Sequence, residues 1–411
     1  MSSSEEVWHA IRCGDVELSS MILRNKEWID VRDENERTLL HETASCGHTE
    51  ITKILLDANA DVDAMDDNNN TPLHDALRYD YFETAALLVA AKASVDDMDA
   101  NDRTALYIAT CNGNLAAVQM LIDAKAAVDI PDQSTNTSLH KAASRGFTEI
   151  ARVLIDANAP LHAMNYENQT PLHLAAILGH AGAAQVLIEA RANVDEKDGK
   201  HMTPLHSAAE GGHVGVVRGL LDGKATIDIG DNTKRTPLHY AAMKNQSETA
   251  KVLINAKATV EAFDDDGITP LYLAASREGL RATQVLIDAK ANVNTKDHGN
   301  YAAIHAAVHT NDPDATVVKM LIDANVDVNV QDNFLRRTPL HLAAMQGRIT
   351  AVRLLLSAHA TLEMEEKWSN AIPLHMAATN GHTEIVSMLL AAKVNELQEM
   401  SNGAKLRRLH C

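Results

Sequence analysis

A four-residue motif, Thr-Pro-Leu-His or a close variant, recurs every 33 residues along most of this chain. Eight copies keep this spacing without interruption, and they start at Thr38, Thr71, Thr104, Thr137, Thr170, Thr203, Thr236 and Thr269. Three shifted or degenerate copies follow, at Ala302, Thr338 and Ile372. A fixed period of about 20 to 50 residues is typical of a solenoid, in which each repeat buries its apolar face only against its neighbours. The sequence therefore predicts one elongated stack of repeats rather than separate globular domains.

The segment that begins at Thr170 shows what each repeat should form. Thr170 can cap a helix with its hydroxyl group, and Pro171 suits the first helical position, where a backbone N–H would have no partner. His173 stands at the third position, from which a side chain can reach back to the backbone of the cap. Gly179 is typical of a helix end. A second helix with the apolar run 186–188 and then a polar turn should follow.

This helix-turn-helix-hairpin repeat resembles the ankyrin repeat. The family pattern of Thr-Pro-Leu-His, Ala-Ala, Gly-His, a Val/Leu run and an Asp before the next Thr recurs in repeat after repeat, over about residues 5 to 396. The resemblance implies an all-α repeat solenoid, an ankyrin-repeat array of helix-turn-helix units joined by β-hairpin loops. Counting both ends, it implies about twelve repeats.

The phase of the motif predicts the boundaries along the chain. Glu5, Val7 and Trp8 replace the motif residues in the first repeat, which favours a polar cap. We expect these segments: 1–37, an N-terminal capping repeat; 38–301, eight regular 33-residue repeats; 302–337, an irregular repeat with insertions; 338–396, the last repeat and C-terminal cap; and 397–411, a frayed basic tail.

The irregular repeat (302–337) is where the period slips. Its interval to the next motif is 36 residues, with two extra residues near 311–314 and one near 334–337. It also lacks the capping Thr and the Pro, so its first helix should start less firmly. We hypothesise that it is a weak link or hinge.

Composition and charge limit the classes of function that this chain can have. The formal net charge of −19 argues against binding of nucleic acid or of an anionic membrane surface over the whole molecule. No secretory signal or membrane-length apolar run is visible. The four cysteines are expected to be reduced, because the equivalent Cys13 and Cys46 should lie farther apart than a disulfide allows. We expect a monomer without membrane insertion, located in the cytoplasm or the nucleus.

The histidines and acidic clusters, which could suggest catalysis or metal binding, recur with the 33-residue period. Nine of the 20 histidines occupy the motif position: His41, His74, His140, His173, His206, His239, His305, His341 and His375. Four more occupy the Gly-His position: His48, His180, His213 and His382. We interpret these as capping and hydrogen-bonding residues, and the acidic clusters at 66–67 and 264–266 as turns. No catalytic motif is present, and we predict no catalytic residues, no cofactor, no metal and no enzymatic activity.

In proteins with the ankyrin fold, partners usually contact the concave side, which hairpin tips and first helices form. Carried over to this sequence, the candidate partner-binding residues make three groups. The basic group is Lys200, Lys234, Arg235, Lys244 and Arg277; the aromatic and apolar group is Tyr301, Phe334, Leu335, Met345 and Trp368; the third group is Tyr166, Ile177 and Leu178. A protein partner with acidic and apolar segments would suit them.

Alternatives remain open at this point. Phe334 and Trp368 could instead pack beneath their longer hairpins. The leading interpretation is a non-enzymatic scaffold or adaptor. Others are a host-directed ankyrin effector, which would act in the host-cell cytosol, the recognition arm of an enzyme complex, and a membrane-skeleton linker.

Overall fold

The computed structural model describes residues 4–409, which form short α-helices joined by turns and hairpin loops. Two compact units are present, an N-terminal unit (Met1–Gly199) and a C-terminal unit (Lys200–Cys411). Within the described residues, β-pairing is limited to two isolated bridges, Arg32 with Thr38 and Lys296 with Ala302. The expected all-α repeat solenoid is confirmed.

The helices of the N-terminal unit are α1 (Ser4–Cys13), α2 (Val16–Ile22), the 3-10 helix η1 (Lys26–Trp28), α3 (Leu39–Cys46), α4 (Thr49–Asp57), α5 (Pro72–Arg78), α6 (Phe82–Ala90), α7 (Ala105–Asn112), α8 (Leu115–Asp123), α9 (Ser138–Arg145), α10 (Thr148–Asp156), α11 (Pro171–Leu178) and α12 (Ala181–Glu189). Those of the C-terminal unit are α13 (Pro204–Gly211), α14 (Val214–Asp222), α15 (Pro237–Met243), α16 (Ser247–Asn255), α17 (Pro270–Ser276), α18 (Leu280–Asp288), α19 (Ala303–His309), α20 (Thr316–Asp323), α21 (Pro339–Gln346), α22 (Ile349–Ser357), α23 (Pro373–Thr379) and α24 (Thr383–Leu409).

Each regular repeat begins its first helix after the motif threonine, and in five of the eight repeats a left-handed glycine ends that helix. In α3, Thr38 has an extended backbone, and its side chain accepts a hydrogen bond from the backbone N–H of His41. The His41 ring in turn accepts from the backbone N–H of Thr38, which completes a capping box. Gly47 then adopts a left-handed φ of 72° and terminates the helix. Local sequence is therefore enough to place this helix.

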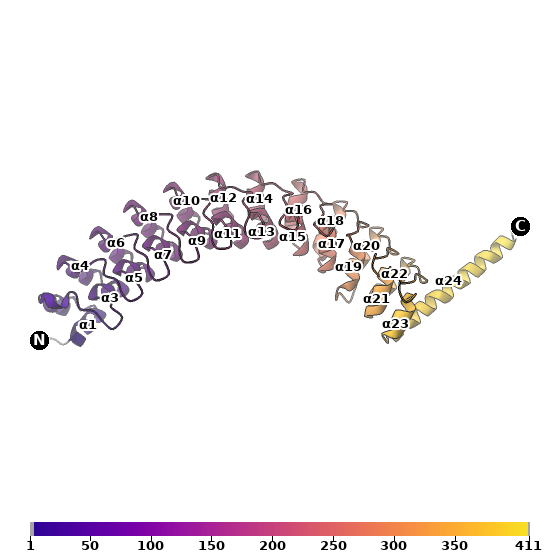
Figure 1. Cartoon of the computed structure of the whole chain (residues 1–411), viewed down its shortest axis with the longest axis horizontal. Helices are drawn as coiled ribbons and strands as arrows, with labels where there is room; N and C mark the ends of the chain where they lie inside the picture. Colours follow the sequence, from indigo (N-terminus) through magenta and orange to yellow (C-terminus); the bar gives the residue numbers. More distant parts are fainter. Residues whose placement is uncertain (1–3, 410–411) are drawn as a thin grey trace. The chain divides into compact units, whose positions relative to one another are not determined.

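Within each unit the helices form two rows (Figure 1). First helices such as α5, α7 and α9 lie side by side, and second helices such as α6, α8 and α10 form the row behind them. The core is aliphatic and follows the period. The motif leucines are buried, and they include Leu40, Leu73, Leu106, Leu139 and Leu172. Burial of each such side chain stabilises the fold by about 2 kcal/mol.

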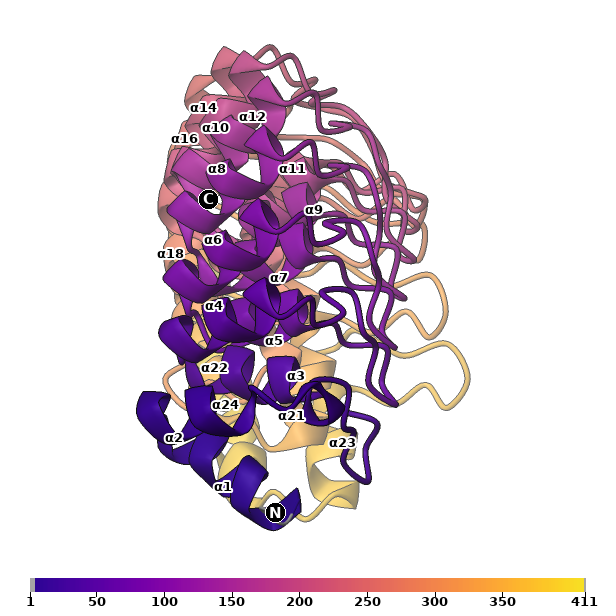
Figure 2. The ribbon, with the colours of Figure 1, turned by 90° about the vertical axis from the view of Figure 1, so that its left-hand side faces the viewer.

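The hairpin loops line one side of each unit (Figure 2). In the loop that follows α4, the carboxylate of Asp66 accepts hydrogen bonds from the backbone N–H groups of Asn68 and Asn70. Asp264 does the same for Asp266 and Ile268. The acidic clusters are thus turn residues, because their carboxylates are used to fold the loop.

The irregular repeat differs from its neighbours in one connection. Six residues, 310–315, join α19 to α20, whereas residues 47–48 suffice between α3 and α4. No glycine terminates α19, and Ala315 takes a left-handed φ of 50° to start α20. The predicted insertion therefore lengthens the turn between the two helices of this repeat.

The C-terminal end departs from the expected frayed tail. Helix α24 has 27 residues and runs to Leu409, so it continues through most of 397–411; residues 410–411 lie outside the described part of the chain. The segment has no proline, and its Leu, Glu, Met, Ala, Lys and Arg residues favour a helix, which here runs through the less favourable Ser-Asn-Gly at 401–403.

Candidate interaction surface

Buried histidines connect each repeat to the next one along the chain. In addition to capping its own helix, His41 donates from Nε2 to the carbonyl oxygen of Asn70, at 2.8 Å, in the following repeat. His140 contacts the carbonyl oxygen of Gln169 in the same way, at 3.0 Å. Equivalent contacts are made by His74, His206, His239, His305 and His341. The sequence predicted the cap but not this second bond.

The two bonds fix the protonation state of these rings. Nδ1 must accept, because it faces a backbone N–H, and Nε2 must donate, because it faces a carbonyl oxygen. Burial lowers the pKa of His41, His74, His140, His239 and His341 below the usual range, and lowers the pKa of His305 to about 4. The neutral ring is the structural form.

Asp75 and Arg78 of α5 form a charged cluster with Arg37, which lies in the hairpin before α3. Asp75 is 1% exposed, and it lies 3.0 Å from Nη2 of Arg37 and 3.8 Å from Nη1 of Arg78. Burial raises its pKa to about 6 despite both cations, and neither contact is aligned as a hydrogen bond. Arg78 also reaches Asp99 at 3.4 Å. These arginines are therefore occupied within the chain.

The third candidate group forms two separate spots in the N-terminal unit. Tyr166 lies in the hairpin before α11 and is 75% exposed. Ile177 and Leu178 lie in the last turn of α11, 37% and 50% exposed. The length of α11, about 12 Å for eight residues, separates them.

Three members of the basic group are paired with carboxylates of the chain itself. Lys234 lies 2.8 Å from Asp265, Arg235 lies 3.0 Å from the buried Asp264, and Lys244 lies 3.2 Å from Glu210; these distances join nitrogen to oxygen atoms. Lys200 and Arg277 are exposed. The group is therefore less available to an external anion than its sequence suggested, because an exposed Lys234 or Lys244 would first have to leave its own partner.

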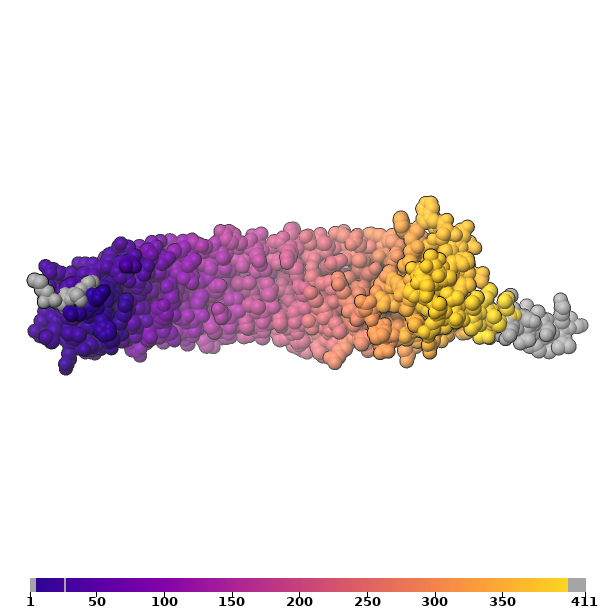
Figure 3. Space-filling model, turned by 90° about the horizontal axis from the view of Figure 1, so that it is seen from below, coloured from indigo at the N-terminus to yellow at the C-terminus, as the bar shows by residue number. Residues whose placement is uncertain are grey.

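Apart from Met345, the aromatic group lies on three consecutive, linked hairpins of the C-terminal unit. The backbone N–H of Asn333 donates to the carbonyl oxygen of Gly299 at 2.9 Å, and that of Lys367 donates to Leu335 at 2.8 Å. These bonds hold the hairpins of Tyr301, of Phe334 with Leu335, and of Trp368 side by side. Figure 2 shows the orange and yellow hairpins of this unit reaching farther out than its other hairpins, and Figure 3 shows the same part projecting from the unit's edge.

The members of the aromatic group differ in how much of each side chain is exposed to solvent. Phe334 is 75% exposed and Trp368 is 72% exposed, so neither packs beneath its hairpin. Lys367 places its Nζ 5.3 Å from the centre of the Trp368 ring, a cation–π contact. Tyr301, Leu335 and Met345 are half-buried. The Tyr301 ring lies tilted against the His305 ring, with their centres 4.9 Å apart, and Met345 lies in the last turn of α21 rather than on a hairpin.

The comparison with known families agrees with this architecture. A family model described as ankyrin repeats in three copies matches overlapping segments from end to end: residues 7–99, 82–165, 106–198, 157–231, 183–264, 224–297, 246–332 and 304–398. The chain belongs to the ankyrin-repeat family. Among curated proteins, none matches the chain.

Ankyrin repeats are generally modules for protein–protein interaction, and the family is generally non-enzymatic. Within residues 4–409, no group of three or more His, Cys, Asp or Glu side chains is placed to hold a metal ion. None of the helices in this described range combines the length and apolarity that a membrane crossing requires. Cys13, Cys46 and Cys111 are free thiols.

The net charge of the whole chain hides an uneven distribution of charge between the two units of this ankyrin array. The N-terminal unit contains 15 Lys and Arg against 33 Asp and Glu, and the C-terminal unit contains 22 against 23, which together make the 37 and 56 of the full sequence. The formal net charges are thus −18 and −1. Counting by repeats would have revealed that the aromatic hairpins belong to a nearly neutral unit.

Proposed function

We propose that this protein is a scaffold or adaptor that binds a partner protein through the hairpin tips of its C-terminal unit. The observation that carries the proposal is the pair Phe334 and Trp368, each about three-quarters exposed on adjacent hairpins that share a backbone hydrogen bond. Large aromatic side chains are the residue type most often found at the energetic centre of protein interfaces. An exposed pair on a rigid support is suited to anchor a partner.

Charge supports the choice of this unit. The C-terminal unit has almost no net charge, so long-range repulsion of an acidic partner is weak there, whereas the N-terminal unit would repel it. Lys367, Arg336 and Arg277 are exposed in the C-terminal unit. A partner segment with apolar anchors and nearby carboxylates therefore fits best, and the protein would bind it as a cytoplasmic monomer.

The test compares three immobilised proteins: wild type, the double variant Phe334→Ala/Trp368→Ala, and Phe263→Ala. Phe263 is the matched control, because it is 52% exposed in the same unit but lies on the hairpin that precedes the one of Tyr301. We expect one defined binding partner in lysate of the source cell to be retained by wild type and Phe263→Ala. The double variant should bind it at least tenfold more weakly, since two anchors contribute about 2 kcal/mol or more.

Both aromatic rings are exposed, so the double variant should keep the thermal stability of wild type. Equal recovery of the partner by the double variant and by wild type would refute the proposal. A circular-dichroism melt of each protein shows that the comparison is between folded chains.

A further inference from the structure

The residue that stands just before a second helix can cover the end of the first helix in the preceding repeat. His382, before α24, lays its ring on Gly347, so that a Cβ atom added to the glycine would come within 2.7 Å of the ring. Phe147, before α10, covers Gly113 in the same way, at 2.8 Å. In both places a flat side chain of the following repeat closes the turn between two helices.

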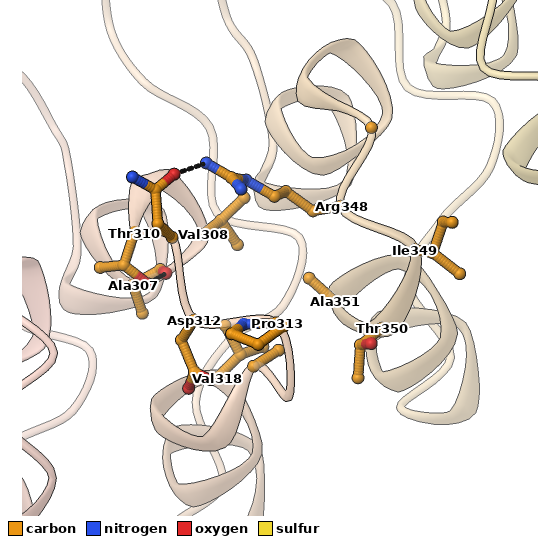
Figure 4. A pocket seen from close by; sticks show the side chains of 13 residues that line it. Ala307, Val308, Thr310, Asp312, Pro313, Val318, Arg348, Ile349, Thr350 and Ala351 are labelled. Carbon is orange, nitrogen blue, oxygen red and sulfur yellow. Dashed lines mark hydrogen bonds between the residues drawn. The ribbon is translucent and has the colours of Figure 1, made fainter.

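Even the irregular repeat has such a neighbour. Arg348, before α22, reaches back to Asn311, with Nη2 2.8 Å from Oδ1 (Figure 4). A pocket of about 290 Å³ remains beside it, and Val308, Pro313 and Ala351 are among the residues of its walls (Figure 4). The longest turn between paired helices of this unit is therefore still bridged by a side chain of the next repeat.

The last helix pair, α23 and α24, lacks this cover among residues 4–409. Gly381 follows α23 with a left-handed φ of 75°, and a Cβ atom added to it would meet no atom of the described residues within 4 Å. His375 is exposed, whereas the other motif histidines are buried. No described residue accepts a hydrogen bond from its Nε2, although its Nδ1 still accepts from the backbone N–H of Ile372.

An apolar stripe on α24 is the third sign of an open face. Leu390, Val394 and Leu397 are 50%, 52% and 54% exposed, and their spacing of four and three residues places them on one face of the helix. Leu221 of α14 and Leu356 of α22 occupy the position of Leu390 in their own repeats, and both are half-buried. The same position is thus exposed only where the array stops.

A following helix covers this position in the other two repeats. Leu356 lines a depression together with Ala392 of α24, and Leu221 lines another together with Val252 and Ala256 of α16. In each case the cover is the second helix of the next repeat, which packs alongside. The equivalent contact at Leu390 requires one more helix, placed beside α24.

The N-terminal repeat of a second copy does not match this face. Asp15 stands just before α2, at the position from which His382 covers Gly347. Its carboxylate caps α2 by accepting a hydrogen bond from the backbone N–H of Leu18 at 2.9 Å. This side chain is therefore already used within its own repeat.

We propose that the outer face of the last helix pair binds an amphipathic α-helix of a partner protein. The helix lies beside α24 as α24 lies beside α22, with its apolar residues against Leu390, Val394 and Leu397. A flat side chain just before its first turn covers Gly381. Residues 403–409 of α24 include three cations and no acidic residue, so carboxylates in the last turns of the partner helix are attracted to that end. This face is separate from the hairpin surface.

The test uses a synthetic peptide of about 25 residues, long enough to form a helix in water. It carries leucines at a spacing of three and four, phenylalanine before the first turn, and glutamates in the last turns. Fluorescence anisotropy of the labelled peptide with the full chain should saturate, with a dissociation constant on the order of 10 to 100 μM. A control peptide of the same composition, with its leucines spread around the helix, should bind about tenfold more weakly.

A variant of the apolar stripe gives a second test. Leu390→Gln/Leu397→Gln changes two exposed residues to another good helix former, so the melting temperature should stay that of wild type. Peptide binding should weaken by about tenfold or more, because two apolar contacts are lost. Leu280→Gln is the matched control, since Leu280 is 40% exposed on α18, a second helix of the same unit. It should bind the peptide like wild type.

Equal binding of the two peptides, or unchanged binding to Leu390→Gln/Leu397→Gln, would overturn this inference. Light scattering of the chain alone checks the other occupant: a dimer that forms as the concentration rises, and is lost in this variant, would assign the face to a second copy instead. The Phe334→Ala/Trp368→Ala variant should bind the peptide like wild type, which keeps the test independent of the hairpin surface.

Discussion

At the residue scale, the motif histidine does more than cap a helix. His140 holds the backbone of Thr137 with one nitrogen and the carbonyl of Gln169 in the next repeat with the other, and it is fully buried. A tyrosine can take over part of this role: Tyr107 donates from its hydroxyl group to Asp132 of the following hairpin. The residue type at this motif position therefore depends on contacts within its own repeat and on contacts with the next repeat.

These buried rings make stability depend on pH. Taking His305, the folded pKa is about 4 and the unfolded pKa about 6.5, so the unfolded chain binds more protons between these values. The contribution of the neutral His305 ring to the free energy of unfolding is complete above pH 6.5. It is lost as the pH falls toward 4, by up to about 3 kcal/mol. Asp75 acts in the opposite sense, because its raised pKa favours the folded state as the pH falls through about 6.

Comparison of wild type with His305→Gln isolates the effect of the His305 ring on the pH dependence of stability, since Asp75 is common to both proteins. Urea unfolding by circular dichroism should show the variant less stable at pH 7.5, with the difference between the two proteins shrinking from pH 6.5 to 4.5. Parallel pH profiles would show that the His305 ring does not titrate in this range.

At the element scale, the irregular repeat differs from the others in how its first helix starts. Ala302 occupies the cap position of α19 but has no side-chain oxygen, although its backbone N–H still reaches His305 at 3.1 Å. Its C-terminal side is also altered, since residues 310–315 replace a short glycine turn. This combination favours local opening of α19 and α20, the hinge that the sequence indicated.

Ala302→Thr should restore the missing cap and stabilise this repeat by about 1 kcal/mol. Space for the side chain is indicated by Thr338, which is 1% exposed at the same position of the next repeat. In hydrogen exchange, amides of α19 should exchange faster than those of α17 and α21 in wild type, and slower in the variant than in wild type.

The control for the cap is Ala256→Thr, at the exposed C-terminal end of α16, which should change stability by less than about 0.5 kcal/mol. Exchange of α19 as slow as that of α17 in wild type would exclude the hinge.

At the scale of the whole molecule, charge is divided unevenly between two units of the same fold. The N-terminal unit carries a formal charge of −18 and the C-terminal unit −1, although both are built from the same repeat. Repulsion within a highly charged unit lowers the stability of its compact state. The two units should therefore respond differently to salt.

Raising the ionic strength from about 0.01 M to about 0.1 M shortens the Debye length from about 30 Å to about 10 Å. We expect protection from hydrogen exchange in the helices α3 to α10 to rise by on the order of 1 kcal/mol, while α15 to α22 change little. An equal response of both units would contradict an electrostatic origin, and sodium chloride and potassium chloride should act alike.

Much of the fold could be predicted from sequence because its determinants are local. Thr38, His41 and Gly47 cap and terminate one helix through contacts within ten residues, and repetition of that pattern gives the order of helices along the chain. The exposed hairpin positions of Phe334 and Trp368 follow from their phase in the repeat. The motif period also assigned the histidines and acidic turns to structure rather than to catalysis.

The candidate site could be predicted only in part. The sequence placed Lys234 and Lys244 on the inner surface but could not show that Asp265 and Glu210 neutralise them. It located the insertion at 311–314 but not the pocket beside Arg348. These contacts join residues from different repeats, 31 to 37 positions apart.

The sequence by itself determined the repeat, its helices and its phase, because caps, glycines and apolar spacing act within a few residues. Only the tertiary structure decided which side chains remain free, which carbonyl groups each histidine reaches, and where the packing of one repeat on the next leaves a pocket. Those outcomes depend on how one repeat stacks on the next, and small offsets between helices are not encoded in a local pattern.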